Sequence, residues 1–146
     1  MFLIANLVAY YAMRERAAEY GMSADMLDKN DRVIDGGLRS LEICARAGVP
    51  VAYGSDLLGQ LQVDQSREFL LRREVLPAID IIRSATTIGA KVLRQEGRLG
   101  TLKAGALADL IVVDGDPLAD LGLFQEQGRH LSAIMKGGVF HKNRLQ

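Results

Sequence analysis

The tripeptide Gly54-Ser55-Asp56 is the part of this chain that is best placed for chemistry. It follows Val49-Pro50-Val51-Ala52-Tyr53, a short apolar run that predicts a strand buried on both faces. Catalytic groups of α/β barrels and open sheets lie at the carboxyl ends of parallel strands, which is where Asp56 would stand. The tripeptide alone favours a simpler role, because an aspartate after a strand more often caps a helix or accepts loop amides.

Other nucleophiles are weaker candidates. Ser55 would need a histidine base nearby, and the sequence has no Gly-x-Ser-x-Gly elbow around it. Cys44 is the only cysteine, which excludes a disulfide within the chain and a cluster of cysteine ligands. It falls in an amphipathic helical stretch, so we expect a buried, inert side chain and a reducing, cytoplasmic compartment.

The two histidines offer little for a metal site. His130 follows Gly128-Arg129 in a polar loop, and His141 lies near the end of a predicted hairpin, so both are expected at the surface. A zinc hydrolase site needs about three protein ligands plus a water molecule. Asp56 is the one credible ligand that this sequence supplies.

Composition excludes several classes of protein. The 146 residues hold 18 basic and 18 acidic side chains, so the formal net charge is zero. Coating a nucleic acid or binding a membrane through a polybasic patch needs an excess of positive charge, so we expect neither partner. With 49% hydrophobic and 25% charged residues the chain is globular. The apolar run 2–13 is too short to cross a bilayer as a helix, which needs about 20 residues.

Residues 1–96 have the pattern of a parallel α/β structure. We expect a strand end that runs into a helix over 2–19, a polar link over 23–35, a helix over 38–47, and helical segments over 66–76 and 77–92. Further predictions are Pro77 at a first helical position, Thr86 or Thr87 as a cap, and a solvated face with the charged residues Arg67, Glu68, Arg72, Arg73 and Glu74. Only one clear strand stands in this part, so its sheet would be incomplete.

After Glu96 the pattern changes to a β-rich one. Residues 97–108 are rich in turns, 109–113 predict a buried strand, and 133–141 predict a hairpin around Gly137-Gly138. We therefore divide the chain into an α/β part, 1–96, and a small β-rich part, 97–146.

Two blocks of sequence resemble the metal-dependent amidohydrolase superfamily. The first is Ala47-Gly48-Val49-Pro50-Val51-Ala52-Tyr53-Gly54-Ser55-Asp56-Leu57-Leu58-Gly59, followed by Ser84-Ala85-Thr86. The second and more specific block runs from Gly97 to Leu118 and leads through spaced glycines into Ala108-Asp109 and an apolar strand. The chain looks most like the carboxyl-terminal third of the branch that holds imidazolonepropionase-like enzymes and prolidase-type or arginine-type Xaa dipeptidases.

The resemblance implies a fold and a site. The fold is a (β/α)8 TIM-type barrel, of which this chain would hold the last strands and helices, with a β-sandwich built from both ends of the polypeptide. Family members hold one or two divalent metals, usually zinc, through histidines, a Lys or Glu, and an Asp after the eighth strand. Asp56 matches that Asp, which touches the metal, takes a proton from the attacking water and hands it to the leaving amine.

The sequence departs from the family pattern by what it does not contain. It has no His-x-His pair, and a complete barrel takes about 250 residues. We therefore expect a fragment: a truncated gene, a partial reading frame or one half of a split enzyme. Its partner would be the rest of the barrel or a second copy of the chain.

Two hypotheses about function remain. The first is a metal-dependent hydrolase of C–N bonds in amides, cyclic amides or dipeptides, with a slight preference for N-acylated amino acids or Xaa dipeptides. This chain alone would be inactive, and Leu57 and Leu58, next to Asp56, would either contact the substrate or pack within the loop. The second is a non-catalytic remnant or interaction module that associates through exposed strand edges.

Overall fold

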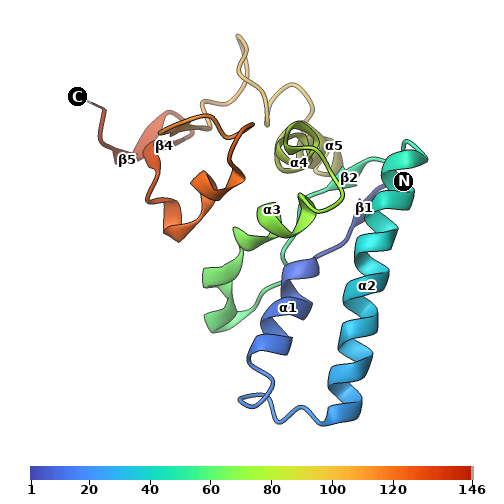
Figure 1. Cartoon of the computed structure of the whole chain (residues 1–146). Coiled ribbons are helices and arrows are strands. Elements are labelled where there is room, and N and C mark those ends of the chain that lie inside the picture. Colours follow the sequence, from blue (N-terminus) through green and yellow to red (C-terminus); the bar gives the residue numbers. More distant parts are fainter. Residues whose placement is uncertain (146) are drawn as a thin grey trace.

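A computed structural model describes residues 1–145 as a mixed α/β chain (Figure 1). The helices and a parallel pair of strands come first and an antiparallel sheet comes last. In chain order the elements are β1 (Leu3–Ile4), α1 (Leu7–Glu15), α2 (Ala24–Arg46), β2 (Val51–Ala52), the 3-10 helix η1 (Gly59–Asp64), α3 (Arg67–Arg72), α4 (Ala78–Ala85), α5 (Thr87–Val92), β3 (Leu110–Val113), the 3-10 helices η2 (Leu121–Phe124) and η3 (Glu126–Gly128), β4 (Leu131–Lys136) and β5 (Val139–Asn143). None of the helices within 1–145 has the length and apolar character needed to span a membrane.

Strands β1 and β2 form a parallel pair. Leu3 lies opposite Val51, and Ile4 lies opposite Ala52. Both residues of β2 are buried, which confirms the prediction of a strand with apolar residues on both faces. The predicted strand end running into a helix is confirmed as β1 and α1, and β1 supplies the neighbour that sequence reasoning did not assign to β2.

Helices α1 and α2 lie side by side in opposite directions (Figure 1). The prediction of a polar link over 23–35 is wrong, because α2 already begins at Ala24. Ser23 caps it by accepting a hydrogen bond from the Met26 N–H at 3.3 Å. Ion pairs of Asp25 with Lys29 and of Asp28 with Arg32, one turn apart, explain why so polar a segment is helical.

The main hydrophobic core joins both parts of the chain. Its buried members come from α1, α2, β2, the segment before α4, α4 itself and η2: Leu7, Leu41, Val51, Leu76, Ile81 and Leu121. Cys44, predicted to be buried, is half-buried and packs against this core. Because Leu121 follows β3, the first and last thirds of the sequence share one core.

The break between α4 and α5 falls at Thr86. Thr86 is the N-cap residue of α5, as predicted, but its hydroxyl donates to the Ile82 carbonyl at 2.8 Å and makes no capping hydrogen bond. Pro77 is the N-cap of α4, one residue before the predicted position. The helix predicted over 66–76 is limited to α3, which ends at Arg72.

Strands β3, β4 and β5 form an antiparallel sheet in that order. Lys136 lies opposite Val139, and the two-residue turn between them is Gly137-Gly138, with φ of +57° and +82°. Two consecutive residues with positive φ are what a type I′ hairpin turn requires. The predicted hairpin is therefore confirmed.

The turn-rich segment after α5 packs tightly on the junction of α4 and α5. Gly100 has φ of +67°, and a Cβ there would overlap the Thr86 carbonyl and lie 2.9 Å from the Thr87 nitrogen. Gly105 also has positive φ, +84°, but a Cβ there would meet no atom within 4 Å.

Alanine substitutions at Gly100 and Gly105 distinguish the effect of backbone strain from that of steric overlap. Gly105→Ala should lower the free energy of unfolding by about 1 kcal/mol through its left-handed conformation alone. Gly100→Ala should lower it by about 3 kcal/mol, because the overlap with Thr86 adds to the same strain. Chemical denaturation of both variants measures the difference, and equal losses would show that this segment does not pack on Thr86.

Candidate functional site

The candidate site lies where the parallel strands end. Because β1 and β2 run in the same direction, the segments that follow them leave from the same edge. Asn6 stands two residues after β1, and Asp56 stands four residues after β2. Both have left-handed backbones, with φ of +50° and +53°, a conformation that Asn and Asp adopt more readily than most residues. Two polar side chains therefore follow the two neighbouring strand ends.

Asp56 is exposed to solvent. Within residues 1–145 no side-chain hydrogen bond or ion pair engages its carboxylate. It also does not cap the helix that follows, since the N-cap of η1 is Leu58, without a side-chain hydrogen bond. Asp56 therefore does not have the helix-capping role that the sequence left open. Its carboxylate is available to a ligand.

The two leucines after Asp56 have different surroundings. Leu57 is buried at 6% exposure and packs with Val8 and Ala12 of α1. Leu58 is 77% exposed and borders a hollow of about 570 Å³ between η1 and the tips of α1 and α2. Leu57 therefore anchors the segment that carries Asp56, whereas only Leu58 presents its side chain to solvent.

Gly54 lets the two strand ends approach closely. A Cβ at this position would overlap Asn6 Oδ1 and lie 2.6 Å from Ile4 Cγ2. Asn6 Oδ1 is itself buried and has no hydrogen-bond partner among the described residues. The sequence analysis did not identify Asn6. The criterion that selected Asp56, a polar residue that follows a strand end, applies to Asn6 as well.

A buried ion pair lies beside the strand ends. The sequence predicted a solvated face that includes Glu68 and Arg72, and for these two residues the prediction is wrong: both side chains are fully buried, with Arg72 Nε donating to Glu68 Oε1 at 2.7 Å. The Arg72 guanidinium lies over the ring of Tyr53 at 5.2 Å. Burial raises the pKa of the Tyr53 hydroxyl, and the negative charge of Glu68 raises that pKa further. Arg73 and Glu74 are exposed, as expected.

The described residues do not form a metal site by themselves. Residues 1–145 contain no group of three or more His, Cys, Asp or Glu side chains that could hold an ion. His141 is exposed and His130 is half-buried in its loop. Asp56 can thus serve as one ligand of a divalent metal, but residues 1–145 do not complete a three-ligand site around it.

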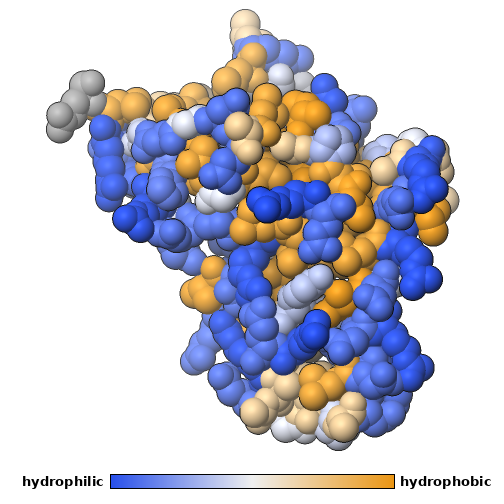
Figure 2. Space-filling view, in the orientation of Figure 1, coloured by the Kyte–Doolittle hydropathy of each residue, from blue (hydrophilic) through white to orange (hydrophobic). Residues whose placement is uncertain are grey.

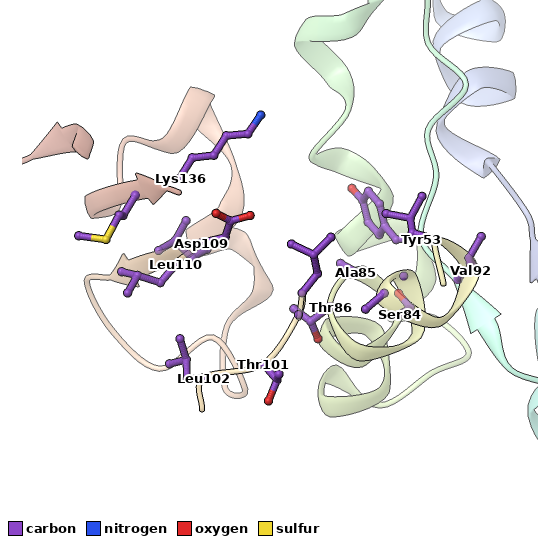
Figure 3. Close-up of a pocket in the computed structure, with 18 of the residues that line it drawn as sticks. Tyr53, Ser84, Ala85, Thr86, Val92, Thr101, Leu102, Asp109, Leu110 and Lys136 are labelled. Atoms are coloured by element: carbon purple, nitrogen blue, oxygen red, sulfur yellow. The ribbon is translucent and has the colours of Figure 1, made fainter. Parts of the chain in front are cut away.

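A cleft of about 940 Å³ separates the helices from the sheet (Figure 3). Tyr53, Ser84 and Thr86 line its helical side, and Leu110 and Lys136 line the side of the sheet. Most of its lining is apolar, and Figure 2 shows hydrophobic residues gathered between the helices and the sheet. The end of β2 therefore borders an open apolar surface.

Comparison with known proteins gives a consistent result. The sequence profile of the amidohydrolase family matches residues 3–140. Over 123 residues the chain is 26% identical to ochratoxinase of Aspergillus niger, an alignment that covers 84% of this chain. A prolidase crystallised with N-methylphosphonate-L-proline is 41% identical, with a TM-score of 0.89 over 97% of this chain. A crystal structure of an amidohydrolase is 39% identical, with a TM-score of 0.91 over 99% of this chain.

The matches cover only part of the other proteins. This chain spans 25% of the ochratoxinase and 35% of each of the two solved chains. It is thus comparable to about a third of a longer polypeptide.

The unequal burial of Leu57 and Leu58 leads to a direct test of how the Asp56 segment is anchored. Leu57→Ala should lower the free energy of unfolding by about 3 kcal/mol, because it leaves a cavity against α1. Leu58→Ala, the matched control, should change it by less than about 0.5 kcal/mol. Urea unfolding followed by circular dichroism measures both, and similar effects at the two positions would show that Leu57 does not anchor the segment.

Proposed function

This chain belongs to the amidohydrolase family, and on that premise we propose that it is the carboxyl-terminal part of a hydrolase of C–N bonds built on a (β/α)8 barrel. Residues 1–96 contribute the last barrel strands and helices, and residues 97–146 contribute to a composite β-sandwich in a cytoplasmic enzyme. The parallel pairing of β1 with β2 and the partial coverage of the prolidase and the amidohydrolase support this assignment.

The observation that carries the proposal is the position of Asp56. Its carboxylate is exposed at the carboxyl end of a parallel strand, where barrels assemble their active sites. One unpaired carboxylate fits a divalent cation such as zinc as a single ligand, beside imidazoles from the rest of the polypeptide. When bound, such a cation supplies a water molecule whose pKa is close to 7. Asp56 accepts the proton of the attacking water and passes it to the leaving nitrogen.

The substrate class we propose is an amide, cyclic amide or dipeptide, with N-acylated amino acids and Xaa dipeptides first. The prolidase that this chain resembles was crystallised with a phosphonate that carries L-proline, which supports a dipeptide. Leu58 is the exposed apolar side chain nearest to Asp56 in sequence and forms an apolar contact with the substrate. Leu57 acts indirectly by holding the segment against α1.

The rest of the barrel occupies the apolar cleft and pairs with β2. Within residues 1–145, β2 has one strand neighbour, and parallel sheets are normally covered on both faces and flanked by further strands. Relatives are about three times as long as this chain, so they contain ample polypeptide to fill the cleft. The alternative occupant is a second copy of the chain, which would make it a self-associating module without catalytic activity.

Activity is tested by complementation. We expect this chain to co-purify with the part of the related prolidase that it does not cover, and the assembled protein, supplied with zinc, to hydrolyse an Xaa-Pro dipeptide. Asp56→Asn should lower kcat by about 1,000-fold, because general acid-base catalysis contributes roughly that much. Asp114→Asn, an exposed aspartate after β3, is the control and should leave kcat unchanged. Full activity of Asp56→Asn, or no activity after assembly, would contradict the proposal.

Substitutions in the cleft test how the chain assembles. Ile111 lines the cleft and is 46% exposed in this chain, so Ile111→Lys should fold normally but prevent association with the complementary part. Val139→Lys places the same charge on an exposed residue of β5 that does not line the cleft, and should assemble normally. Size-exclusion chromatography distinguishes the two. Assembly of Ile111→Lys would show that the cleft is not the docking surface, and a homodimer of the unmixed chain would favour the alternative.

A further inference from the structure

The buried Glu68–Arg72 pair contacts the backbone at the start of α1, the helix that follows β1, and at the end of β2. Glu68 Oε2 accepts a hydrogen bond at 2.8 Å from the N–H of Val8, which lies in the first turn of α1, four residues after the last residue of β1. That N–H has no partner within its own helix, and the carboxylate satisfies it. A negative charge at this end of α1 is also favoured by the helix dipole.

Arg72 makes the corresponding contacts at the end of β2. Its Nη1 donates to the carbonyl of Ala52, the last residue of β2, at 3.0 Å and to Ser84 Oγ at 3.3 Å. Ser84 in turn accepts the Tyr53 N–H at its carbonyl, at 3.1 Å. The guanidinium therefore links β2, α3 and α4 just before the segment that leads to Asp56.

Stabilisation of the fold does not by itself explain why Glu68 and Arg72 are buried as charged residues. Two buried charges pay a large desolvation cost, and apolar side chains of similar size often replace such pairs without loss of stability. Arg72 Nη2 is moreover buried without a partner among the described residues, which is a further cost. What apolar side chains cannot do is accept the Val8 N–H and donate to the Ala52 carbonyl at the same time.

We propose that Glu68 and Arg72 are positioning residues that hold the ends of β1 and β2 at a fixed separation and thereby orient Asp56. This role of the pair rests on the proposed function of Asp56. Neither side chain reaches solvent, so neither contacts a substrate. The pair acts through the backbone at Val8 and Ala52.

The test uses the full 146-residue chain, labelled with 15N, and does not depend on activity. The double variant Glu68→Leu/Arg72→Met removes both charges and keeps apolar volume. We expect its thermal midpoint to stay within about 5 °C of the unaltered chain. The Val8 and Tyr53 amides should exchange with solvent at least about 10-fold faster. Val8 loses its acceptor, the Glu68 carboxylate, and the Tyr53 N–H donates to Ser84, which loses its contact with Arg72. Signals of residues 54–56 should shift or broaden.

Matched variants separate positioning from packing. Arg73→Met/Glu74→Leu alters the adjacent exposed charges on the same segment and should change none of these readings. Arg72→Lys keeps the buried charge, but a single ammonium cannot form the two-sided contact of a guanidinium, so the signals of residues 54–56 should still shift. If the double variant does not fold, Arg72→Lys decides the matter. Unchanged exchange and unchanged signals in a folded variant would overturn the proposal.

The same substitutions then apply to the assembled protein. Arg72→Lys should lower kcat by about 10-fold or more with little change in KM, because it displaces Asp56 without touching a substrate. A change confined to KM would contradict positioning. If the assembled protein is inactive without any substitution, the proposed function of Asp56 is refuted. Amide exchange in the unassembled chain still decides whether the Glu68–Arg72 pair holds the strand ends.

Discussion

The parallel pairing of Leu3 with Val51 and of Ile4 with Ala52 determines where the candidate site forms. Parallel strands deliver the segments that follow them to one edge, and here those segments carry Asn6 and Asp56. Gly54 is needed because the Asn6 side chain leaves no room for a Cβ. The site is thus a consequence of strand direction and close approach, and not of any cluster of charged side chains.

So short a pair of strands needs support from its surroundings. Within this chain the support is of two kinds: the hydrophobic core around Leu41 and Ile81, and the Glu68–Arg72 pair, which contacts the backbone beside both strands. The outer edge of β2 and the apolar cleft lack such cover among the described residues. If the chain is the carboxyl-terminal part of a longer barrel enzyme, as proposed, the remaining polypeptide would provide this cover.

The sequence predicts correctly those elements that neighbouring residues determine. The hairpin around Gly137-Gly138 and the apolar strand at Val51–Ala52 were correct, because a turn type and β-branched residues specify them directly. The helix from Ala24 was missed because its stability comes from a Ser23 cap and ion pairs in a segment that looks like a polar linker. Burial of Glu68 and Arg72 could not be predicted, since it depends on Val8 and Ala52, which are distant in sequence. The place of Asp56 after a predicted strand makes it a candidate, whereas Asn6 falls in an apolar run whose pattern mainly predicts a helix.

A crystal structure of the assembled protein grown with zinc shows whether Asp56 is a metal ligand. We expect a carboxylate oxygen of Asp56 at about 2.0–2.2 Å from the ion, with imidazoles of the complementary part completing the site. A zinc ion bound elsewhere, with the Asp56 carboxylate turned toward solvent or held by loop amides, would contradict it.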